Sequence, residues 1–142
     1  MSLRACVILL GVITAACGSG PTGPTSFGSA EALVTALRAQ GVTATTGQTL
    51  PMQSHPYFST NARIVTMNSA ILNVLEYDSS GDADREAATV SPTGSSIGST
   101  QIEWVGPPHF FKNGRLIVLY VGDRSDVLQP LTTVLGAQFS PR

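Results

Sequence analysis

The sequence Leu-Ile-Val-Leu-Tyr-Val at positions 116–121 is the most apolar run downstream of residue 17. It holds no charged residue and no alternation of apolar with polar residues, which is typical of a strand buried on both faces. We therefore expect residues 115–121 to form such a strand, and the rest of the fold to be arranged around it.

Two more strands are predicted at residues 62–67 and 70–77. They are joined by Asn68 and Ser69, whose residue types suit a tight hairpin turn. The second strand has apolar residues on both faces, which predicts a central place in the sheet. Residues 47–56 are expected to be irregular, because two prolines there cannot donate to a strand ladder. Two further strands are predicted, an edge strand at 42–46 and another at 101–105, the latter separated from residue 115 by a Pro-Pro and Asn113-Gly114 connection.

Three helices are predicted along the chain. The first begins at a Ser29 cap and ends before Gly41, with its leucines and valine on one face. The second covers residues 83–90. The third holds the apolar residues before Gly136, and Pro130 is expected to kink it or to delay its start. Hairpins that alternate with helices favour a two-layer α+β domain, in which a mainly antiparallel sheet of four to five strands carries about three helices on one face.

Composition limits the classes of function. The chain has 142 residues with 8 basic and 9 acidic side chains, a net charge of −1 and 12% charged residues. Nucleic-acid binding calls for clustered Lys and Arg, so we predict no nucleic-acid partner. Hydrophobic residues make up 42% of the chain, which argues against disorder of the whole chain and suits one domain of ordinary size.

The N-terminal residues have the pattern of an export signal. Arg4 and the amino group give a positive start, residues 5–13 are apolar, and residues 14–16 are small. The apolar run is shorter than the roughly 20 residues that a membrane span needs. This order of charge, short apolar run and small residues predicts a signal that is removed on export.

Residues 13–17, Ile-Thr-Ala-Ala-Cys, resemble the lipobox of bacterial lipoproteins, with threonine at the second position where leucine is commoner. The resemblance implies that residues 1–16 are a lipoprotein signal peptide. It also implies that Cys17 carries a diacylglyceryl thioether, usually with a third chain such as palmitate on its amine. Two acyl chains hold a protein stably at a bilayer, so the membrane is a predicted partner. Cys6 would leave with the signal, and Cys17 alone forms no internal disulfide; the alternatives are an ordinary secretory signal cleaved near Ala16 and a buried N-terminal strand.

Residues 17–26 are predicted to be the lipidated cysteine and a flexible tether. After the cysteine they are Gly, Pro, Ser and Thr, without a bulky or charged side chain. Such a segment reaches about 15–18 Å, which would hold the domain close to the membrane surface. Residues 27–142 are predicted to form the single α+β domain.

The segment from Trp104 to Phe111 is the candidate interaction loop. It contains the one Trp of the chain and two of its five Phe. Its prolines restrict the backbone, so its aromatic side chains would meet a partner at little entropic cost, and aromatic residues are enriched at interface hot spots. The alternative is that Trp104 and one Phe close the end of the core. The candidate contact residues are Trp104, Pro107, Pro108, His109, Phe110 and Phe111.

Catalytic chemistry has weaker support in the sequence. His109 and Glu103 would make an acid–base pair if the fold brought them together, which leaves a small hydrolase as an alternative. The Gly-x-Ser-x-Gly match at residues 94–98 lacks the preceding strand and following helix of a hydrolase. Neither His55 nor His109 lies in a zinc motif, and helix capping explains the acidic residues at 78–86. We therefore predict no catalytic residue, no metal and no cofactor.

Several segments of the mature chain are familiar together: residues 95–98, Trp104-Val105, residues 107–111, residues 114–123 and Leu135-Gly136. With them, residues 27–139 resemble a group of small exported bacterial lipoproteins that have no assigned activity. The resemblance implies a compact single domain and a membrane-tethered protein, and it carries over no catalytic residue. We therefore expect a lipid-anchored envelope protein that faces the periplasm or the cell exterior and binds an envelope protein partner without catalysis. A small hydrolase using His109 with Glu103 or a nearby serine, and an inhibitor or immunity-type module, are the alternatives.

Overall fold

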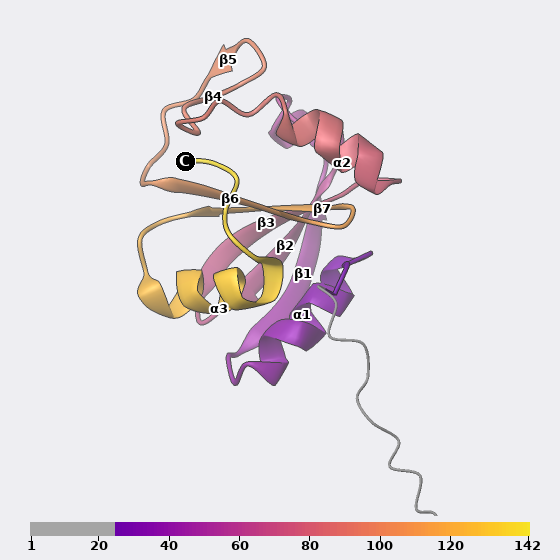
Figure 1. Cartoon of the computed structure of the whole chain (residues 1–142), viewed down its shortest axis with the longest axis vertical. Coiled ribbons are helices and arrows are strands. Elements are labelled where there is room, and N and C mark those ends of the chain that lie inside the picture. The colour runs from indigo at the N-terminus through magenta and orange to yellow at the C-terminus, as the bar shows by residue number, and fades with distance from the viewer. Residues whose placement is uncertain (1–24) are drawn as a thin grey trace, which may run out of the picture.

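The computed structural model describes residues 25–142 (Figure 1). The predicted signal peptide at residues 1–16, the predicted lipidation site Cys17 and most of the predicted tether lie outside the described residues. No helix in the described part of the chain is long and apolar enough to span a bilayer. In chain order the elements are α1 (Ala30–Ala39), β1 (Ala44–Leu50), the 3-10 turn η1 (Met52–Ser54), β2 (Ala62–Met67), β3 (Ala70–Glu76), α2 (Ser80–Ala87), β4 (Ser96–Ile97), β5 (Thr100–Gln101), β6 (Pro108–Asn113), β7 (Leu116–Val121) and α3 (Ser125–Leu135).

Five strands form one antiparallel sheet in the order β1-β2-β3-β7-β6. The apolar run at residues 116–121 is β7, and it lies between β3 and β6. The predicted hairpin is present as β2 and β3. Its turn residues Asn68 and Ser69 both have positive φ, 48° and 67°, as a type I′ turn requires. The predicted α+β class with a mainly antiparallel sheet is confirmed.

The helices cover both faces of the sheet, so the prediction that they share one face is wrong. The α1–α3 face is packed by α1 and α3, and the α2 face is packed by α2 and the β4–β5 hairpin (Figure 1). The reason lies in the two central strands, which are apolar on both sides. Val74 and Val118 belong to the core of the α1–α3 face, whereas Leu75 and Ile117 belong to the core of the α2 face. A strand that is apolar on both sides buries both only if each face is covered.

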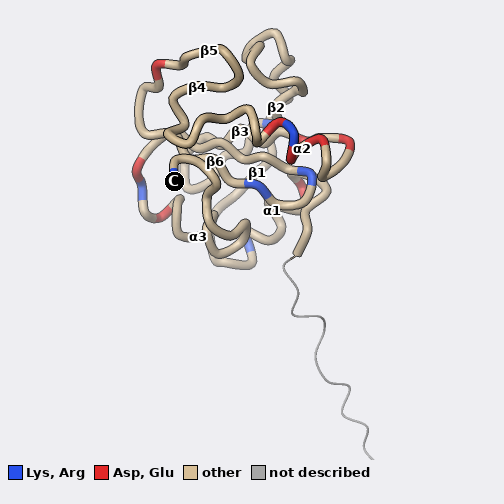
Figure 2. The backbone as a smooth tube through the Cα atoms, turned by 45° about the horizontal axis from the view of Figure 1, so that its top comes forward, with Lys and Arg blue, Asp and Glu red and all other residues tan. Residues whose placement is uncertain are grey.

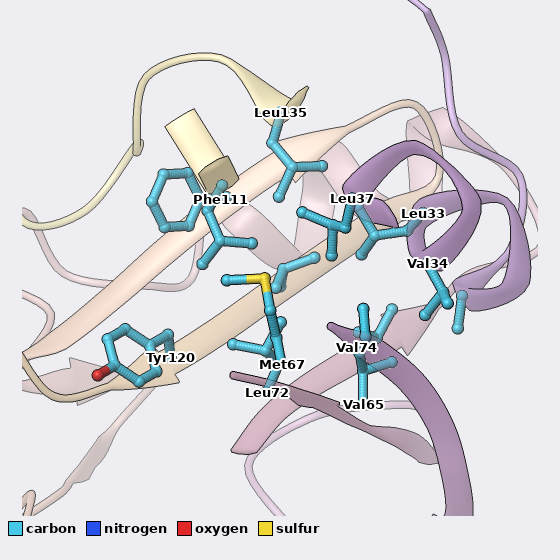
Figure 3. Packing of buried hydrophobic residues seen from close by; sticks show 14 of the residues in the cluster. Leu33, Val34, Leu37, Val65, Met67, Leu72, Val74, Phe111, Tyr120 and Leu135 are labelled. Atoms are coloured by element: carbon cyan, nitrogen blue, oxygen red, sulfur yellow. The ribbon is translucent and has the colours of Figure 1, made fainter. Parts of the chain in front are cut away.

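The core of the α1–α3 face is a closed hydrophobic cluster (Figure 3). Leu33 and Leu37 of α1 point toward the sheet residues Met67 and Leu72, and Leu135 of α3 lies beside Leu37. All five side chains are buried. This face therefore has the dense packing that supplies most of the stability of a small domain.

The helix ends follow local capping signals. For α1 the predicted ends are confirmed, because Ser29 Oγ accepts from the Ala32 N–H at 3.2 Å and Gly41 follows the helix at a φ of +81°. Helix α2 begins at Ser80, three residues before its predicted start, with Ser79 as its cap. Helix α3 begins at Ser125, so Pro130 lies in its interior and does not delay its start, and it ends at Leu135 with Gly136 as its cap.

Two of the strand predictions are wrong in extent. Only Gln101 of the predicted strand at 101–105 lies in a strand, the short β5. The neighbour of β7 is β6, which begins inside the Pro-Pro sequence, where a proline at the first position of a strand costs the ladder little. Strand β1 runs on to Leu50, with a shift of register between Thr46 and Thr49, so the first residues of the segment predicted to be irregular belong to the sheet.

The outer edge of β6 is covered by the end of the chain. The Phe110 N–H donates to the Ser140 carbonyl at 2.8 Å, and the Phe139 N–H donates to the Phe110 carbonyl at 2.8 Å. This pairing fixes β6 and the residues that precede it against the sheet. Those preceding residues include Trp104, which packs on the α2 face.

Candidate functional site

A cavity of about 150 Å³ opens on the α2 face, beyond the part covered by α2. We call it the Trp104 pocket. Its floor is the sheet, through side chains of β2, β3 and β7: Ala62, Asn73, Leu75, Leu119 and Val121. Its walls come from the segment around η1 and from one residue of the chain before β6: Leu50, Ser54, His55, Tyr57, Phe58 and Trp104. The pocket is therefore assembled from segments that are far apart in the sequence.

His55 is the most unusual residue of the Trp104 pocket. Its side chain is 7% exposed, and neither ring nitrogen has a hydrogen-bond partner among the described residues. Its ring instead approaches two aromatic rings, Tyr57 at 6.4 Å and Phe58 at 6.2 Å between centroids. A buried polar group without a partner costs about 1–3 kcal/mol, so this position is expensive for the fold.

The backbone around η1 holds His55 in place. The His55 N–H donates to the Met52 carbonyl at 3.1 Å, and the His55 carbonyl accepts from the Phe58 N–H at 3.1 Å. Pro51 and Pro56 flank this tight turn and fix φ at their own positions. The imidazole thus stands in the pocket because of the local chain and not because a side-chain hydrogen bond draws it there.

Trp104 forms a rigid wall of the pocket. Its indole N–H donates to the Gly94 carbonyl at 2.7 Å. Its ring meets Tyr57 edge-on at 6.4 Å and Phe110 edge-on at 5.9 Å. Such edge-to-face contacts favour a single orientation. One side of the indole is held by the core, and the half-buried remainder faces the pocket.

The rest of the predicted interaction loop is placed differently. Phe110 and Phe111 are buried on opposite faces of β6, so the prediction that they are presented to a partner is wrong. Alternation along a strand sends consecutive side chains to opposite faces, and both faces here are cores. Pro107 is exposed and Pro108 is half-buried, beside the fully exposed Val105.

His109 is not brought together with Glu103. Its ring is half-buried, stacks on Tyr120 at 6.2 Å between centroids, and has Nδ1 2.6 Å from Oε1 of Gln138. The stacking on Tyr120 places His109 on the α1–α3 face, away from the Trp104 pocket. Glu103 is exposed to solvent. The partner of His109 is therefore an amide, which neither orients nor charges an imidazole as a carboxylate would.

The lining of the Trp104 pocket is uncharged: no Asp, Glu, Lys or Arg contributes to it. Charged residues gather instead on and beside α2, as Figure 2 shows. Several of them are paired there, as in the contact of 2.6 Å between Lys112 and Asp84 and the ion pair of Arg85 with Asp82. Burial raises the pKa of Tyr57, which keeps its hydroxyl protonated and able to donate at the pocket wall.

A second buried polar group lies deeper in the same core. The hydroxyl of Tyr77 has no hydrogen-bond partner among the described residues. Burial raises the pKa of Tyr77, and the nearby carboxylate of Glu86 raises it further. Within residues 25–142 no group of three or more His, Cys, Asp and Glu side chains is arranged to hold a metal ion.

Sequence reasoning missed the contribution of the His55-Pro56-Tyr57-Phe58 segment. Its signal is nevertheless visible: aromatic residues next to prolines, within residues 47–61, which contain no charged residue. The same features drew attention to Trp104. Asn73 is a second signal, because it is a half-buried polar residue between Leu72 and Val74 of a central strand, where amides are uncommon.

Comparison with protein-family models, with curated proteins and with solved structures gives no match for this chain. Any assignment of function therefore rests on the chain's own residues and their geometry.

Proposed function

We propose that this protein is an exported bacterial lipoprotein, anchored through lipid on Cys17, whose folded domain binds an envelope protein without catalysis. The N-terminal pattern supports the anchor, since the apolar run, the small residues and Cys17 stand in the order of a lipoprotein signal. The Trp104 pocket supports the binding role. It has aromatic walls, and behind them lies the buried imidazole of His55, whose nitrogens have no partner among the described residues and which therefore lowers the stability of the domain.

The observation that carries the binding role is the position of the exposed apolar side chains. Three large hydrophobic side chains are exposed in the described part of the chain: Val105 at 102%, Ile71 at 60% and Met52 at 39%. Val105 follows Trp104, and Met52 lies between the pocket residues Leu50 and Ser54. Ile71 is two residues before Asn73 and so shares its face of β3. Each of the three thus lies within two residues of one that lines the Trp104 pocket, and exposed apolar side chains near an aromatic pocket are typical of a protein-binding surface.

The arrangement of side chains supports binding over catalysis. His55 contacts rings and has no carboxylate or hydroxyl partner among the described residues to orient it. His109 is paired with an amide on the other face. A general base normally works together with a nucleophile and an orienting partner; His55 has neither among the described residues, and the partner of His109 is the neutral amide of Gln138.

The anchor is tested by following the native product through detergent phase separation. Wild type is expected in the detergent phase, with an N-terminal peptide that begins at acylated Cys17 by mass spectrometry. Cys17→Ala is expected to lose the lipid and leave the detergent phase. Cys6→Ala is the matched control and should change neither result, because Cys6 is predicted to leave with the signal. An unmodified Cys17 in an aqueous wild-type product would contradict the anchor.

The binding surface is tested by site-specific photo-crosslinking in intact cells. A crosslinking residue at Val105 or at Ile71 is expected to capture the same envelope protein, and the product should disappear when Trp104→Ala is added. The control position is Thr132, which is exposed on α3 at the other face. Equal capture at all three positions, or capture at Thr132 alone, would refute the binding surface.

A further inference from the structure

We propose that residues 21–24 of this chain, Pro-Thr-Gly-Pro, dock in a hollow at the ends of α1 and α3 and so fix the domain relative to its anchor. These residues belong to the predicted tether and lie outside the described residues. The consequence at the membrane rests on the proposed anchor at Cys17. The docking itself needs no lipid, so the two can be tested apart.

The hollow lies on the α1–α3 face and has a volume of about 470 Å³. We call it the helix-end hollow. On one side are Ala36, Ala39 and Gln40 at the end of α1, and on the other are Thr133 and Val134 at the end of α3. A cavity of about 150 Å³ takes up benzene in another protein, so the helix-end hollow has room for a few residues of extended chain.

The described chain begins in this hollow. Thr25 is the first described residue, and it lines the hollow together with Phe27. Phe27 is buried, its N–H donates to Asn113 Oδ1 at 3.1 Å, and its carbonyl accepts from the Arg115 N–H at 3.3 Å. The residues before Thr25 are therefore attached to a fixed point at the hollow. Attachment over so few residues gives them a millimolar effective concentration there, so that even weak contacts hold them.

The prolines of the segment suit the apolar part of the lining. Pro21 and Pro24 are three residues apart, and an extended polyproline helix has three residues per turn, so both rings lie on one side of such a segment. Proline also restricts the free chain, which lowers the entropic cost of docking. The apolar side chains available to the rings include Ala36, Ala39 and Val134.

The polar part of the lining favours a peptide over a lipid chain. Four of the ten described lining residues have polar side chains: Thr25, Gln40, Asn113 and Thr133. The backbone of a polyproline helix has no internal hydrogen bonds, so its carbonyls are free to accept from the exposed side-chain amide of Gln40. An acyl chain on Cys17 would bury these polar groups without hydrogen bonds, which costs free energy. No Asp, Glu, Lys or Arg is among the described lining residues, which suits an uncharged segment and disfavours a charged headgroup.

Docking shortens the tether and orients the domain. With residues 21–24 in the hollow, only residues 18–20 remain between Cys17 and the docked segment. Three flexible residues reach about 9–10 Å, compared with about 15–18 Å for the whole predicted tether. The ends of α1 and α3 then face the membrane, and the Trp104 pocket on the other face of the sheet stays open to a partner.

The experiment measures backbone order in the tether of the wild-type product in detergent micelles. Nitrogen-15 relaxation gives order parameters for the amides of Thr22 and Gly23, which lie between the two prolines. We expect values of about 0.85, as in rigid backbone, whereas an undocked tether would give values below about 0.6. Ala39→Phe adds a ring in the helix-end hollow and should lower both values below about 0.6. Ala32→Phe is the matched control: it adds the same ring at an exposed position of α1 outside the hollow and should leave both values unchanged.

Cys17→Ala separates the docking from the anchor. We expect this unlipidated variant to keep the high order parameters of Thr22 and Gly23. Their loss would show that the lipid chain occupies the hollow, which would overturn the docking of the peptide. Low values in wild type would overturn it without the need for any variant to fold, and equal values in the two phenylalanine variants would overturn it as well. Detergent phase separation would still decide the anchor separately.

Discussion

The two faces of the sheet are covered by different kinds of secondary structure. The α1–α3 face is covered by helices of 10 and 11 residues, which press aliphatic side chains onto the strands. The α2 face is covered by an 8-residue helix, a loop around η1 and a hairpin whose two strands, β4 and β5, have two residues each. Both buried side chains that lack a hydrogen-bond partner in the described chain, His55 and Tyr77, belong to the α2 side.

This difference separates stability from function within one small domain. A helix presents a continuous stripe of side chains to the sheet, and the helix-end hollow of about 470 Å³ on the α1–α3 face is lined by residues of the two helices, among them Ala36, Ala39 and Val134. Loops and short strands cover a face unevenly, and here the uneven cover leaves the Trp104 pocket. Polar groups that cost stability are tolerated at sites of function and are compensated elsewhere. We infer that packing on the α1–α3 face stabilises the domain and offsets the destabilising effect of the buried polar groups on the α2 face.

The sharpest test of this division is a cavity on the α1–α3 face. Leu33→Ala removes a fully buried side chain of α1 and should lower the free energy of unfolding by about 2–5 kcal/mol. Chemical denaturation followed by circular dichroism measures the loss. In the folded variant the indole N–H signal of Trp104 in a proton–nitrogen correlation spectrum should be unchanged, because α1 lies on the other face. The exposed Thr132→Ala is the control and should change stability by less than about 0.5 kcal/mol. A shifted Trp104 indole signal in Leu33→Ala would show that the two faces are coupled.

A substitution of opposite sign is expected on the α2 face. His55→Phe keeps a ring in place and removes two buried nitrogens that have no partner in the described chain, so it should raise the free energy of unfolding by about 1 kcal/mol or more. The matched control is His109→Phe, which removes the contact with Gln138 and should lower that free energy by about 0.5–1.5 kcal/mol. Denaturant midpoints of the three proteins measure both changes. A loss of stability in His55→Phe equal to that in His109→Phe would mean that His55 has a structural role.

Most of the fold could be predicted because its signals are local. Ser29 and Gly41 bound α1, Asn68-Ser69 forms the hairpin turn, and the run at 116–121 is the central β7. The missed strand β6 also had a local signal. An Asn-Gly pair flanked by apolar residues is a strong hairpin signal, and Asn113-Gly114 joins β6 to β7 in this way. The preceding prolines obscured it, although Pro108 stands at the first position of the strand, where proline is tolerated.

The site could be predicted only in part, because it depends on contacts between distant segments. Trp104 was identified from its aromatic and proline-rich surroundings, and it does line the pocket. Phe110 and Phe111 share those surroundings, but strand alternation buries one on each face. Nothing in the order of residues joins His55 to Asn73 or to Trp104; the tertiary fold alone brings them together. The face on which α2 packs was likewise fixed by the two-sided apolar pattern of the central strands and not by the helix itself.

The smallest expected effect is a dependence of stability on alkaline pH that comes from Tyr77 on the α2 face. Burial, together with Glu86, raises the pKa of Tyr77 in the folded chain, whereas an unfolded tyrosine titrates near its ordinary value of about 10. Above that pH the unfolded chain gives up its proton while folded Tyr77 keeps it. The folded state then binds more protons, so stability falls as pH rises.

Tyr77→Phe should remove this dependence and, by the same reasoning as His55→Phe, raise the free energy of unfolding at neutral pH by about 1 kcal/mol, because the lost hydroxyl has no hydrogen-bond partner in the described chain. Denaturant unfolding of both proteins at a series of pH values measures the difference. Above about pH 10 the unfolding constant of wild type should rise by up to tenfold per pH unit relative to that of the variant, the effect of one linked proton. If the free energies of unfolding of wild type and variant fell in parallel as the pH rose, the alkaline loss of stability would come from other groups. The hydroxyl of Tyr77 would then have no destabilising effect on the α2 face.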